Sequence, residues 1–276
     1  MNTSFRTVDE AEHYLALPVL GSIPKMPKAE IGKNNLVAAE DSNSPGAEVF
    51  RTLRATLSML GREKDRKTYL FTSALPGEGK TFTSLNYSVS LAQQGLRTLL
   101  VDIDLRRPAV EAFFTGKHRH LPGVTDFLLG RAKFNELCLQ HKDISKLFWM
   151  PSGNSVPNPS EMLMQTDFQQ FLNEGLAHFD RIVLDTAPLL PVSDTLMLAA
   201  KVQTVVLVVQ GCKTSRKAVE HSLQLLNKAN APIAGIVLNL LPNRRFSGYY
   251  YSYYHGYGYG HYGYGDKEVD KTPVDA

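Results

Sequence analysis

The chain has 276 residues, of which 43% are hydrophobic and 21% are charged, a composition typical of a globular protein with a sizeable core. Its formal net charge of +3 is too small to indicate a nucleic-acid-binding protein. The two cysteines, Cys138 and Cys212, have no CxxC spacing and indicate neither a disulfide framework nor a zinc site, so a reducing cytoplasm is expected.

Residues 1–40 are expected to form an N-terminal arm and not a domain. In this region a short apolar stretch, YLALPVLGSIP, leads into a loop rich in Lys, Gly and Asn. A helix is predicted over residues 47–60, because apolar residues recur there at helical spacing. Ser44 and Pro45, just before it, are typical of a helix start.

From residue 68 the chain alternates between short apolar strands and helical stretches. The strand TYLFTS at 68–73 is followed by a glycine-containing turn and a predicted helix over 80–94. Further strands rich in Val, Leu and Ile are predicted at 97–104, 147–153, 181–187, 204–210 and 233–241. Such strands are covered on both faces, so the sequence predicts an α/β fold with a doubly wound, mostly parallel sheet over 41–245. Ligand sites are then expected at the carboxyl ends of the strands.

The first of these strand ends carries a phosphate-binding motif. The segment ALPGEGKT, which ends at Thr81, matches the P-loop pattern except that Ala74 replaces the usual first glycine. Its backbone N–H groups can surround a triphosphate at a helix N-terminus, Lys80 can neutralise phosphate oxygens and Thr81 can bind magnesium. The alternative, an accidental glycine-rich turn, is disfavoured by the strand and helix on either side. The predicted nucleotide-binding residues are Gly77, Glu78, Gly79, Lys80, Thr81 and Phe82.

Three aspartates follow at the ends of two later strands. Asp102 and Asp104 lie on one face of the strand LLVDID, and Asp185 ends the strand IVLD. Each alone is more often a turn or cap residue, but three carboxylates beside a P-loop favour metal binding and proton transfer. We predict Thr81, Asp104 and Asp185 as magnesium ligands, directly or through water. Asp102 is the predicted base, and the predicted catalytic set is Asp102, Asp104 and Lys80.

Residues 246–276 are predicted to form a flexible tail. Nine of the twelve tyrosines lie between Tyr249 and Tyr264, among glycines that oppose a packed core element. The segment is either a sticky low-complexity tail or a display of phenolic hydroxyls for a reaction. The P-loop and the placed carboxylates favour the second interpretation, phosphate transfer to tyrosine. The predicted phosphate acceptors are Tyr249, Tyr250, Tyr251, Tyr253, Tyr254, Tyr257, Tyr259, Tyr262 and Tyr264.

This combination of motifs resembles the bacterial tyrosine kinases of capsule and exopolysaccharide export. The segments ALPGEGKT, LLVDIDLRRP and IVLDTAP correspond to the Walker A, A-prime and B motifs of that family, and a tyrosine cluster follows them. PVLGSIP at 18–24 and PNPSE at 157–161 also match, so the resemblance spans nearly the whole chain. It implies a P-loop NTPase fold of the MinD and ParA group and an autokinase that uses ATP and Mg²⁺ to regulate polysaccharide polymerisation and export.

The resemblance also implies partners. The motif Glu48-x-x-Arg51-x-x-Arg54 would hold kinase domains in a ring whose subunits phosphorylate one another's tails in trans. The same three residues could instead form an intrahelical ion-pair face. A membrane-embedded chain-length regulator would activate the kinase, and a tyrosine phosphatase would oppose it. The sequence shows no apolar run long enough for a membrane span, so we expect the chain in the cytoplasm, at the inner face of the plasma membrane, through a partner or a further segment.

Several positions qualify the resemblance. Leu75 replaces the signature lysine of the partition and cell-division ATPases, which argues against a plain ParA-like or MinD-like switch. Ala109 stands where some kinases of the family carry a gating tyrosine, so gating by an internal tyrosine is not expected. Asn239 resembles a position near the adenine base, or it is a buried turn-capping residue. Arg106 and Arg107 either stabilise transferred phosphate or form a solvated basic turn.

Two other functions remain open from the sequence. An ATPase switch of the ParA or MinD type would use the same P-loop without transferring phosphate to protein. A non-enzymatic scaffold would use the tail as a sticker and keep a vestigial P-loop. The intact set of P-loop and carboxylate residues argues against the scaffold.

Overall fold

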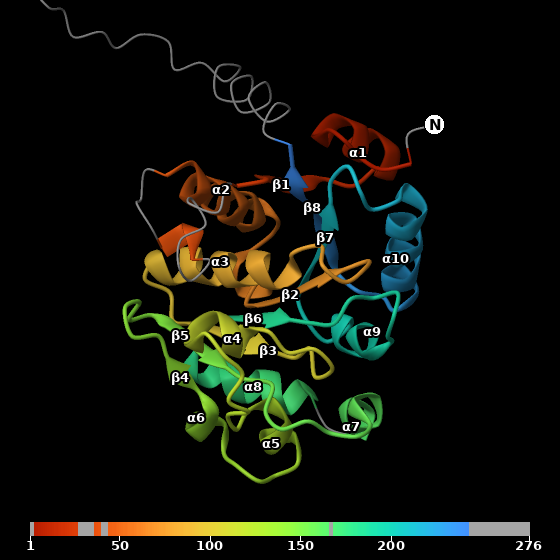
Figure 1. Ribbon diagram of the computed structural model, residues 1–276. Coiled ribbons are helices and arrows are strands. Elements are labelled where there is room, and N and C mark those ends of the chain that lie inside the picture. The colour runs from red at the N-terminus through yellow and green to blue at the C-terminus, as the bar shows by residue number, and fades with distance from the viewer. Residues whose placement is uncertain (1–2, 27–35, 40–43, 166–167, 243–276) are drawn as a thin grey trace, which may run out of the picture.

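The computed structural model describes residues 3–26, 36–39, 44–165 and 168–242. Across these residues runs an eight-stranded sheet in the order β1-β8-β7-β2-β6-β3-β5-β4 (Figure 1). Adjacent strands are parallel except for the pair β4 and β5. The strands are β1 Val19–Pro24, β2 Thr68–Ser73, β3 Thr98–Asp102, β4 Leu139–Gln140, β5 Leu147–Met150, β6 Arg181–Asp185, β7 Thr204–Gln210 and β8 Ile233–Leu241. The prediction of a doubly wound, mostly parallel α/β fold is confirmed.

Helices cover both faces of this sheet. Within the described ranges they are α1 Val8–Leu15, α2 Pro45–Met59, α3 Lys80–Gln93, α4 Val110–Thr115, α5 Val124–Leu128, α6 Phe134–Leu137, α7 Pro159–Gln165, α8 Phe168–His178, α9 Asp194–Ala199 and α10 Arg216–Lys228. Helices α2, α3 and α4 contribute to the core on one face, and α8, α9 and α10 to the core on the other (Figure 1). The central strands are therefore buried on both sides, as their continuous apolar sequences predict.

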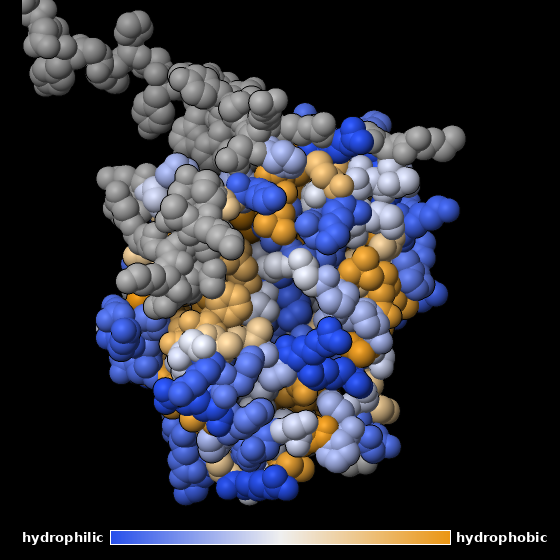
Figure 2. All heavy atoms as spheres, viewed as in Figure 1, coloured by the Kyte–Doolittle hydropathy of each residue, from blue (hydrophilic) through white to orange (hydrophobic). Residues whose placement is uncertain are grey.

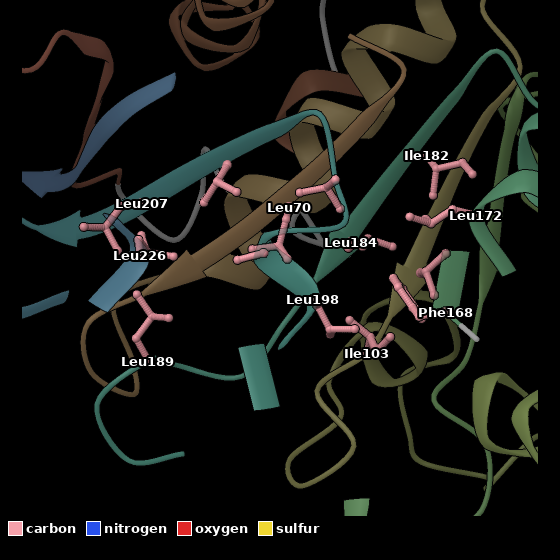
Figure 3. Close-up of a cluster of buried hydrophobic side chains, with 14 of the residues drawn as sticks. Leu70, Ile103, Phe168, Leu172, Ile182, Leu184, Leu189, Leu198, Leu207 and Leu226 are labelled. Carbon is pink, nitrogen blue, oxygen red and sulfur yellow. The ribbon is translucent and has the colours of Figure 1, made fainter. Parts of the chain in front are cut away.

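Side chains that alternate along the strands supply these two cores. On β2, Leu70 lies in the core beneath α8, α9 and α10, whereas Tyr69 and Phe71 lie in the core beneath α2 and α3. Figure 3 shows the first of these cores, with Leu70, Leu184 and Leu207 from three neighbouring strands facing leucines of the covering helices. Close packing on both faces holds the carboxyl ends of these strands in fixed positions.

The sequence predicts most element boundaries closely. Strands β2, β7 and β8 have the predicted limits, but β3 ends at Asp102 and β6 at Asp185, earlier than predicted. After these residues the chain leaves the sheet and continues into the loops that follow the two strands. Helix α2 begins at Pro45, and Ser44 Oγ accepts the N–H of Ala47 at 3.1 Å, so the predicted start signal is confirmed.

Part of the predicted N-terminal arm is built into the fold. β1 pairs in parallel with β8, and Phe5, just before α1, is fully buried. Proline and glycine weaken the strand pattern of PVLGSIP, which is why the sequence did not predict β1. The predicted limits of arm, kinase domain and tail stay predictions. No helix within the described ranges combines the length and apolar character that crossing a membrane requires.

Candidate functional site

The predicted P-loop lies between β2 and α3, at the carboxyl edge of the sheet. Gly77 and Gly79 have φ angles of 82° and 92°, which glycine adopts without strain and other residues rarely adopt. Gly79 is the N-cap of α3, and the helix begins at Lys80. The loop borders a cavity of about 590 Å³. A helix N-terminus at a cavity of this size is suited to binding phosphate groups, because the first N–H groups of a helix have no partner within the helix.

A cation and two carboxylates meet at the head of this loop. Lys80 Nζ lies 3.0 Å from Asp104 Oδ2 and 3.6 Å from Asp185 Oδ1. Thr81 Oγ1 donates a hydrogen bond of 2.6 Å to Asp185 Oδ2. Burial alone would lower the pKa of Lys80, but the carboxylates of Asp185 and Asp104 outweigh it and raise that pKa. The lysine is therefore fully charged and pre-positioned beside the space where phosphates would bind.

Asp102 is buried more deeply than Asp104. Its Oδ2 accepts the N–H groups of Ala109 and Val110 at 2.8 and 2.9 Å, and its Oδ1 accepts the N–H of Asp104 at 3.2 Å. It is completely buried and does not line the cavity, whereas Asp104 does. Burial and the nearby charge of Asp185 raise the pKa of Asp102 to about 8. Asp102 therefore fixes the loop after β3 and, once ionised, is a stronger base than an ordinary carboxylate.

The raised pKa of Asp102 predicts a pH-dependent stability. Between its ordinary value of 3.8 and about 8, the folded protein holds a proton that the unfolded chain has released. The free energy of unfolding therefore falls as pH rises through this window, by at most about 1.4 kcal/mol per pH unit for one group. Asp102→Asn should flatten this slope in urea unfolding between pH 5 and pH 8. The exposed control Asp143→Asn should leave the slope as it is, and an unchanged slope in Asp102→Asn would contradict the assignment.

Glu78 and Asn239 were predicted to bind the nucleotide, but neither residue lines the cavity. For Glu78 the prediction concerned the backbone N–H groups of the loop, and it stays a prediction. Glu78 is 2% exposed, and its carboxylate accepts the N–H of Leu75 at 2.6 Å. Asn239 is 1% exposed and donates from Nδ2 to the carbonyl of Glu78 at 2.8 Å. Asn239 Oδ1 also accepts the N–H of Leu240 at 2.9 Å, which fits the turn-capping alternative. The remaining predicted loop residues, Gly77, Gly79, Lys80, Thr81 and Phe82, all line the cavity.

The two arginines after β3 have different surroundings. Arg106 Nε lies 2.7 Å from Asp194 Oδ2, and Arg106 Nη2 donates to Ser160 Oγ at 3.0 Å. Ser160 in turn donates to Asp194. Arg106 and Arg107 are both exposed, but the contact of Arg107 is made by its backbone N–H, which donates to Asp104 Oδ1 at 3.0 Å. Both arginines line the cavity, so Arg106 is a positioned cation at its rim and not a loosely solvated turn residue.

Several residues near the cavity were not predicted from the sequence. Phe113, Pro191 and Val192 give it an apolar side, and apolar surface gathers near α3 and α4 in Figure 2. Asp194 follows the strand that ends at Asp185, and it anchors Arg106 across a sequence distance of 88 residues. Only the rule that sites form beyond the carboxyl ends of strands could have drawn attention to this segment.

The predicted oligomerisation motif lies on α2. Arg51 Nη1 forms an ion pair of 2.6 Å with Glu48 Oε2, and Arg54 donates to the carbonyl of Ser90 on α3. The pair of Arg51 and Glu48 matches the intrahelical ion-pair alternative, whereas Arg54 bonds to a different helix, and neither contact tests the ring. The predicted acceptor tyrosines, Tyr249 to Tyr264, lie outside the described residues and stay predictions.

The donor set suits a magnesium ion that arrives with phosphate. Asp185 Oδ1 is buried and has no hydrogen-bond partner in the described part of the chain, and Thr81 Oγ1 lies beside the same carboxylate. Hydroxyl and carboxylate oxygens are preferred magnesium ligands. The described residues contain no group of three or more His, Cys, Asp or Glu side chains that could hold a metal ion. Thr81, Asp104 and Asp185 therefore fit an ion that also takes oxygens from phosphate and water.

Comparison with known proteins shows which families and structures this chain is similar to. Residues 71–233 match the family model described as AAA domain. The chain is 32% identical over 207 residues to the putative tyrosine-protein kinase CapB of Staphylococcus aureus, covering 75% of this chain and 90% of CapB. It is 32% identical over 208 residues to the tyrosine-protein kinase YwqD of Bacillus subtilis, covering 75% and 86%. The tyrosine-protein kinase etk of Escherichia coli is 32% identical over 215 residues, and the match covers 29% of etk.

Solved structures agree with these relatives. The kinase domain of the Escherichia coli tyrosine kinase ETK aligns with a TM-score of 0.78 at 29% identity, covering 86% of this chain and 94% of that domain. The chimerical protein CapA2B2 aligns with a TM-score of 0.77 at 28% identity, covering 86% and 100%. MinD of Pyrococcus horikoshii, in complex with Mg-ADP, aligns over 66% of this chain and 76% of its own with a TM-score of 0.53 at 20% identity, and so shares the fold.

Proposed function

Because this chain belongs to the family of bacterial tyrosine-protein kinases, we propose that it is an autokinase that uses ATP and Mg²⁺ to phosphorylate its own C-terminal tyrosine cluster. The enzyme class, protein-tyrosine kinase, follows from the family. One observation carries the proposal: Lys80, Asp104, Asp185 and Thr81 converge where a P-loop meets a cavity. This arrangement supplies the positive charge and oxygen ligands that phosphoryl transfer requires.

In the proposed reaction the phenol oxygen of a tyrosine attacks the γ-phosphorus of ATP. The bond between that phosphorus and the β,γ-bridging oxygen breaks, ADP leaves, and the phenol proton passes to a carboxylate. Lys80 would exchange Asp104 for phosphate oxygens, and the N–H groups of the P-loop would hold the β-phosphate. Magnesium, bound through Thr81, Asp104 and Asp185, directly or by water, would supply positive charge that offsets the charge on the leaving group.

We assign the proton to Asp102, as the sequence predicted. With a pKa of about 8 it must first release its own proton. Once ionised it matches a phenol, whose pKa is near 10, better than an ordinary carboxylate does, so proton transfer costs less. The carboxylate is occupied by the N–H groups of Ala109 and Val110. To reach an acceptor hydroxyl, the segment after β3 must release at least one of these hydrogen bonds.

The cavity favours tyrosine as the acceptor. Phe113, Pro188, Pro191 and Val192 line it together with Asp104. An aromatic ring could bury its apolar face against these side chains while its hydroxyl reaches the polar end. The shorter side chains of serine and threonine would leave this surface exposed to water.

The positions of the other tyrosines support the tail as substrate. Outside the cluster the chain has only Tyr14, Tyr69 and Tyr87. Tyr69 is 2% exposed and Tyr87 is 1% exposed, so neither can enter another active site without local unfolding. Tyr14 is 44% exposed and is the competing acceptor among the described residues.

We further propose that the kinase works as a ring-like homo-oligomer at the inner face of the plasma membrane. A membrane chain-length regulator would activate it, an opposing tyrosine phosphatase would reset it, and capsule or exopolysaccharide export would be the process controlled. The name CapB among the relatives and the chimeric CapA2B2 structure support this proposal. Phosphate on several tail tyrosines would add negative charge and loosen the assembly.

Transfer between subunits can be tested by mixing two variants. The acceptor variant carries Lys80→Met and an intact tail, and the donor variant carries phenylalanine at all nine tail tyrosines. Both carry Tyr14→Phe. With magnesium and labelled ATP, we expect label on the tail of the acceptor variant only in the mixture, at a rate that rises with the concentration of the donor. Mass spectrometry of peptides locates the phosphate.

The same samples separate the rival functions. Free phosphate released by the wild-type protein with no label on tyrosine would indicate an ATPase switch. Label on the wild-type tail without label in the mixture would indicate transfer within one chain and would contradict the trans mechanism. Native mass spectrometry before ATP is added should show an oligomer that Glu48→Ala, Arg51→Ala and Arg54→Ala together disrupt. A monomer in the unsubstituted protein contradicts the ring.

A further inference from the structure

A buried carboxylate lies inside the P-loop but points away from the nucleotide cavity. Glu78 accepts the N–H of Leu75 at 2.6 Å and the N–H of Gln210 at 3.2 Å. The hydroxyl of Thr214 donates a further hydrogen bond to it. Leu75 belongs to the P-loop itself, whereas Gln210 is the last residue of β7 and Thr214 lies in the turn after it. The carboxylate therefore ties the P-loop to the end of a neighbouring strand.

Thr214 is delivered to this carboxylate by a fixed turn. The residue is 4% exposed and lies in the turn between β7 and α10. In this turn the N–H of Gly211 donates to the carbonyl of Asn239 at 2.8 Å, and the N–H of Cys212 donates to the carbonyl of Phe5 at 2.7 Å. The turn is thus held by β8 and by the N-terminal segment. Its threonine hydroxyl has little freedom to leave Glu78.

A second contact holds the main chain of the same residue. Asn239 Nδ2 donates to the carbonyl of Glu78, and a Cβ on Gly79 would collide with this nitrogen. The peptide between Glu78 and Gly79 is therefore fixed by β8, directly before the helix start at Lys80. Side chain and main chain of Glu78 are braced from two adjacent strands, which sets the orientation of the N–H groups that follow.

We propose that Thr214 is a positioning residue for nucleotide binding, acting through Glu78. A free carboxylate in this loop would repel a triphosphate a few ångströms away, because like charges at that distance interact strongly outside bulk water. The three donors keep the carboxylate facing the protein and keep the loop in its phosphate-ready shape. Thr214 does not touch the nucleotide. This inference rests on the proposed use of ATP, so the binding of nucleotide to the wild-type protein is measured first.

The test compares Thr214→Val with Thr214→Ser in the full chain. Valine keeps the volume of threonine but removes the donor, whereas serine keeps it. For Thr214→Val we expect about tenfold weaker binding of Mg-ATP by isothermal titration calorimetry, the scale of one hydrogen bond to a charged group. The KM for ATP should rise by the same factor with little change in kcat. Thr214→Ser should stay within about twofold of wild type.

Further variants separate positioning from a general loss of fold. Thr204→Val changes another buried threonine at the opposite end of β7 and should leave the affinity for Mg-ATP unchanged. Glu78→Gln removes the negative charge but cannot accept all three hydrogen bonds, so we expect weaker binding here too. Tighter binding by Glu78→Gln, or wild-type affinity in Thr214→Val, would overturn the proposal. If the wild-type protein does not bind Mg-ATP, the proposed function itself fails.

Discussion

Replacing Lys80 by methionine is expected to reduce tyrosine phosphorylation about a thousandfold, the scale of one charged group in phosphoryl transfer. The side chain lies 3.0 Å from Asp104 and 3.6 Å from Asp185, and it belongs to a residue of the phosphate-binding loop itself. Methionine fills a similar volume but cannot offset charge on the transferred phosphate. Incorporation of labelled phosphate into tyrosine, measured at saturating ATP, gives the loss directly.

Lys80→Met should also lower the free energy of unfolding, and by more at pH 8 than at pH 5. Without the lysine, Asp104 and Asp185 lose their buried counter-charge, and breaking such a pair costs about 3–5 kcal/mol when the remaining charge stays ionised. At lower pH Asp185, whose pKa is raised by burial, can take up a proton, which relieves the cost. Lys80→Met should therefore unfold at lower urea than wild type at pH 8, with a smaller difference at pH 5. The exposed control Lys201→Met should show no such difference. An equal loss at both pH values would mean that the lysine does not neutralise these carboxylates.

The sequence predicted which residues meet at one edge of the sheet where chemistry and local structure coincide. Lys80 and Thr81 follow a glycine loop between a strand and a helix, so their place relative to phosphate is set by neighbours in the chain. Asp102 and Asp185 end adjacent parallel strands, and the register pairs these two residues directly. Strand order could not be read from the sequence, but any parallel sheet with both strands near the P-loop brings such aspartates to one edge.

The parts that the sequence did not predict depend on contacts between distant segments. Nothing near Glu78 shows that its carboxylate faces inward, because its partners Gln210 and Thr214 lie more than 130 residues away. Asn239 was predicted either to lie near the adenine or to cap a buried turn; its contacts fit the second alternative, and they also brace the P-loop. The motif of Glu48, Arg51 and Arg54 lies on a helix whether it holds a ring together or forms an intrahelical ion pair. The assembly therefore stays a proposal.

Replacing Asp185 by asparagine is expected to have opposite effects on activity and stability. Burial raises the pKa of Asp185 more than Lys80 and the Thr81 hydroxyl lower it, so the folded protein keeps this carboxylate at a cost. Asparagine can still accept the hydrogen bond from Thr81 but carries no charge. Around pH 8 the variant should therefore unfold at the same or higher urea than wild type. The charge of Asp185 also raises the pKa of Asp102. Asp185→Asn should therefore bring the pKa of Asp102 closer to its ordinary value.

Activity should fall at least a hundredfold in Asp185→Asn, because the amide is a poor ligand for magnesium and cannot hold its charge. A measurement that does not depend on turnover is the gain in affinity for ADP on adding magnesium, which should be large in wild type and nearly absent in the variant.

Combining Lys80→Met with Asp185→Asn separates the roles of the two residues. Lys80→Met with Asp185→Asn should recover much of the stability lost in Lys80→Met, because one unpaired buried charge is gone, while phosphorylation stays undetectable. If the double variant is no more stable than Lys80→Met at pH 8, the lysine and this carboxylate do not interact in the folded protein, and the charge balance inferred for the site is wrong.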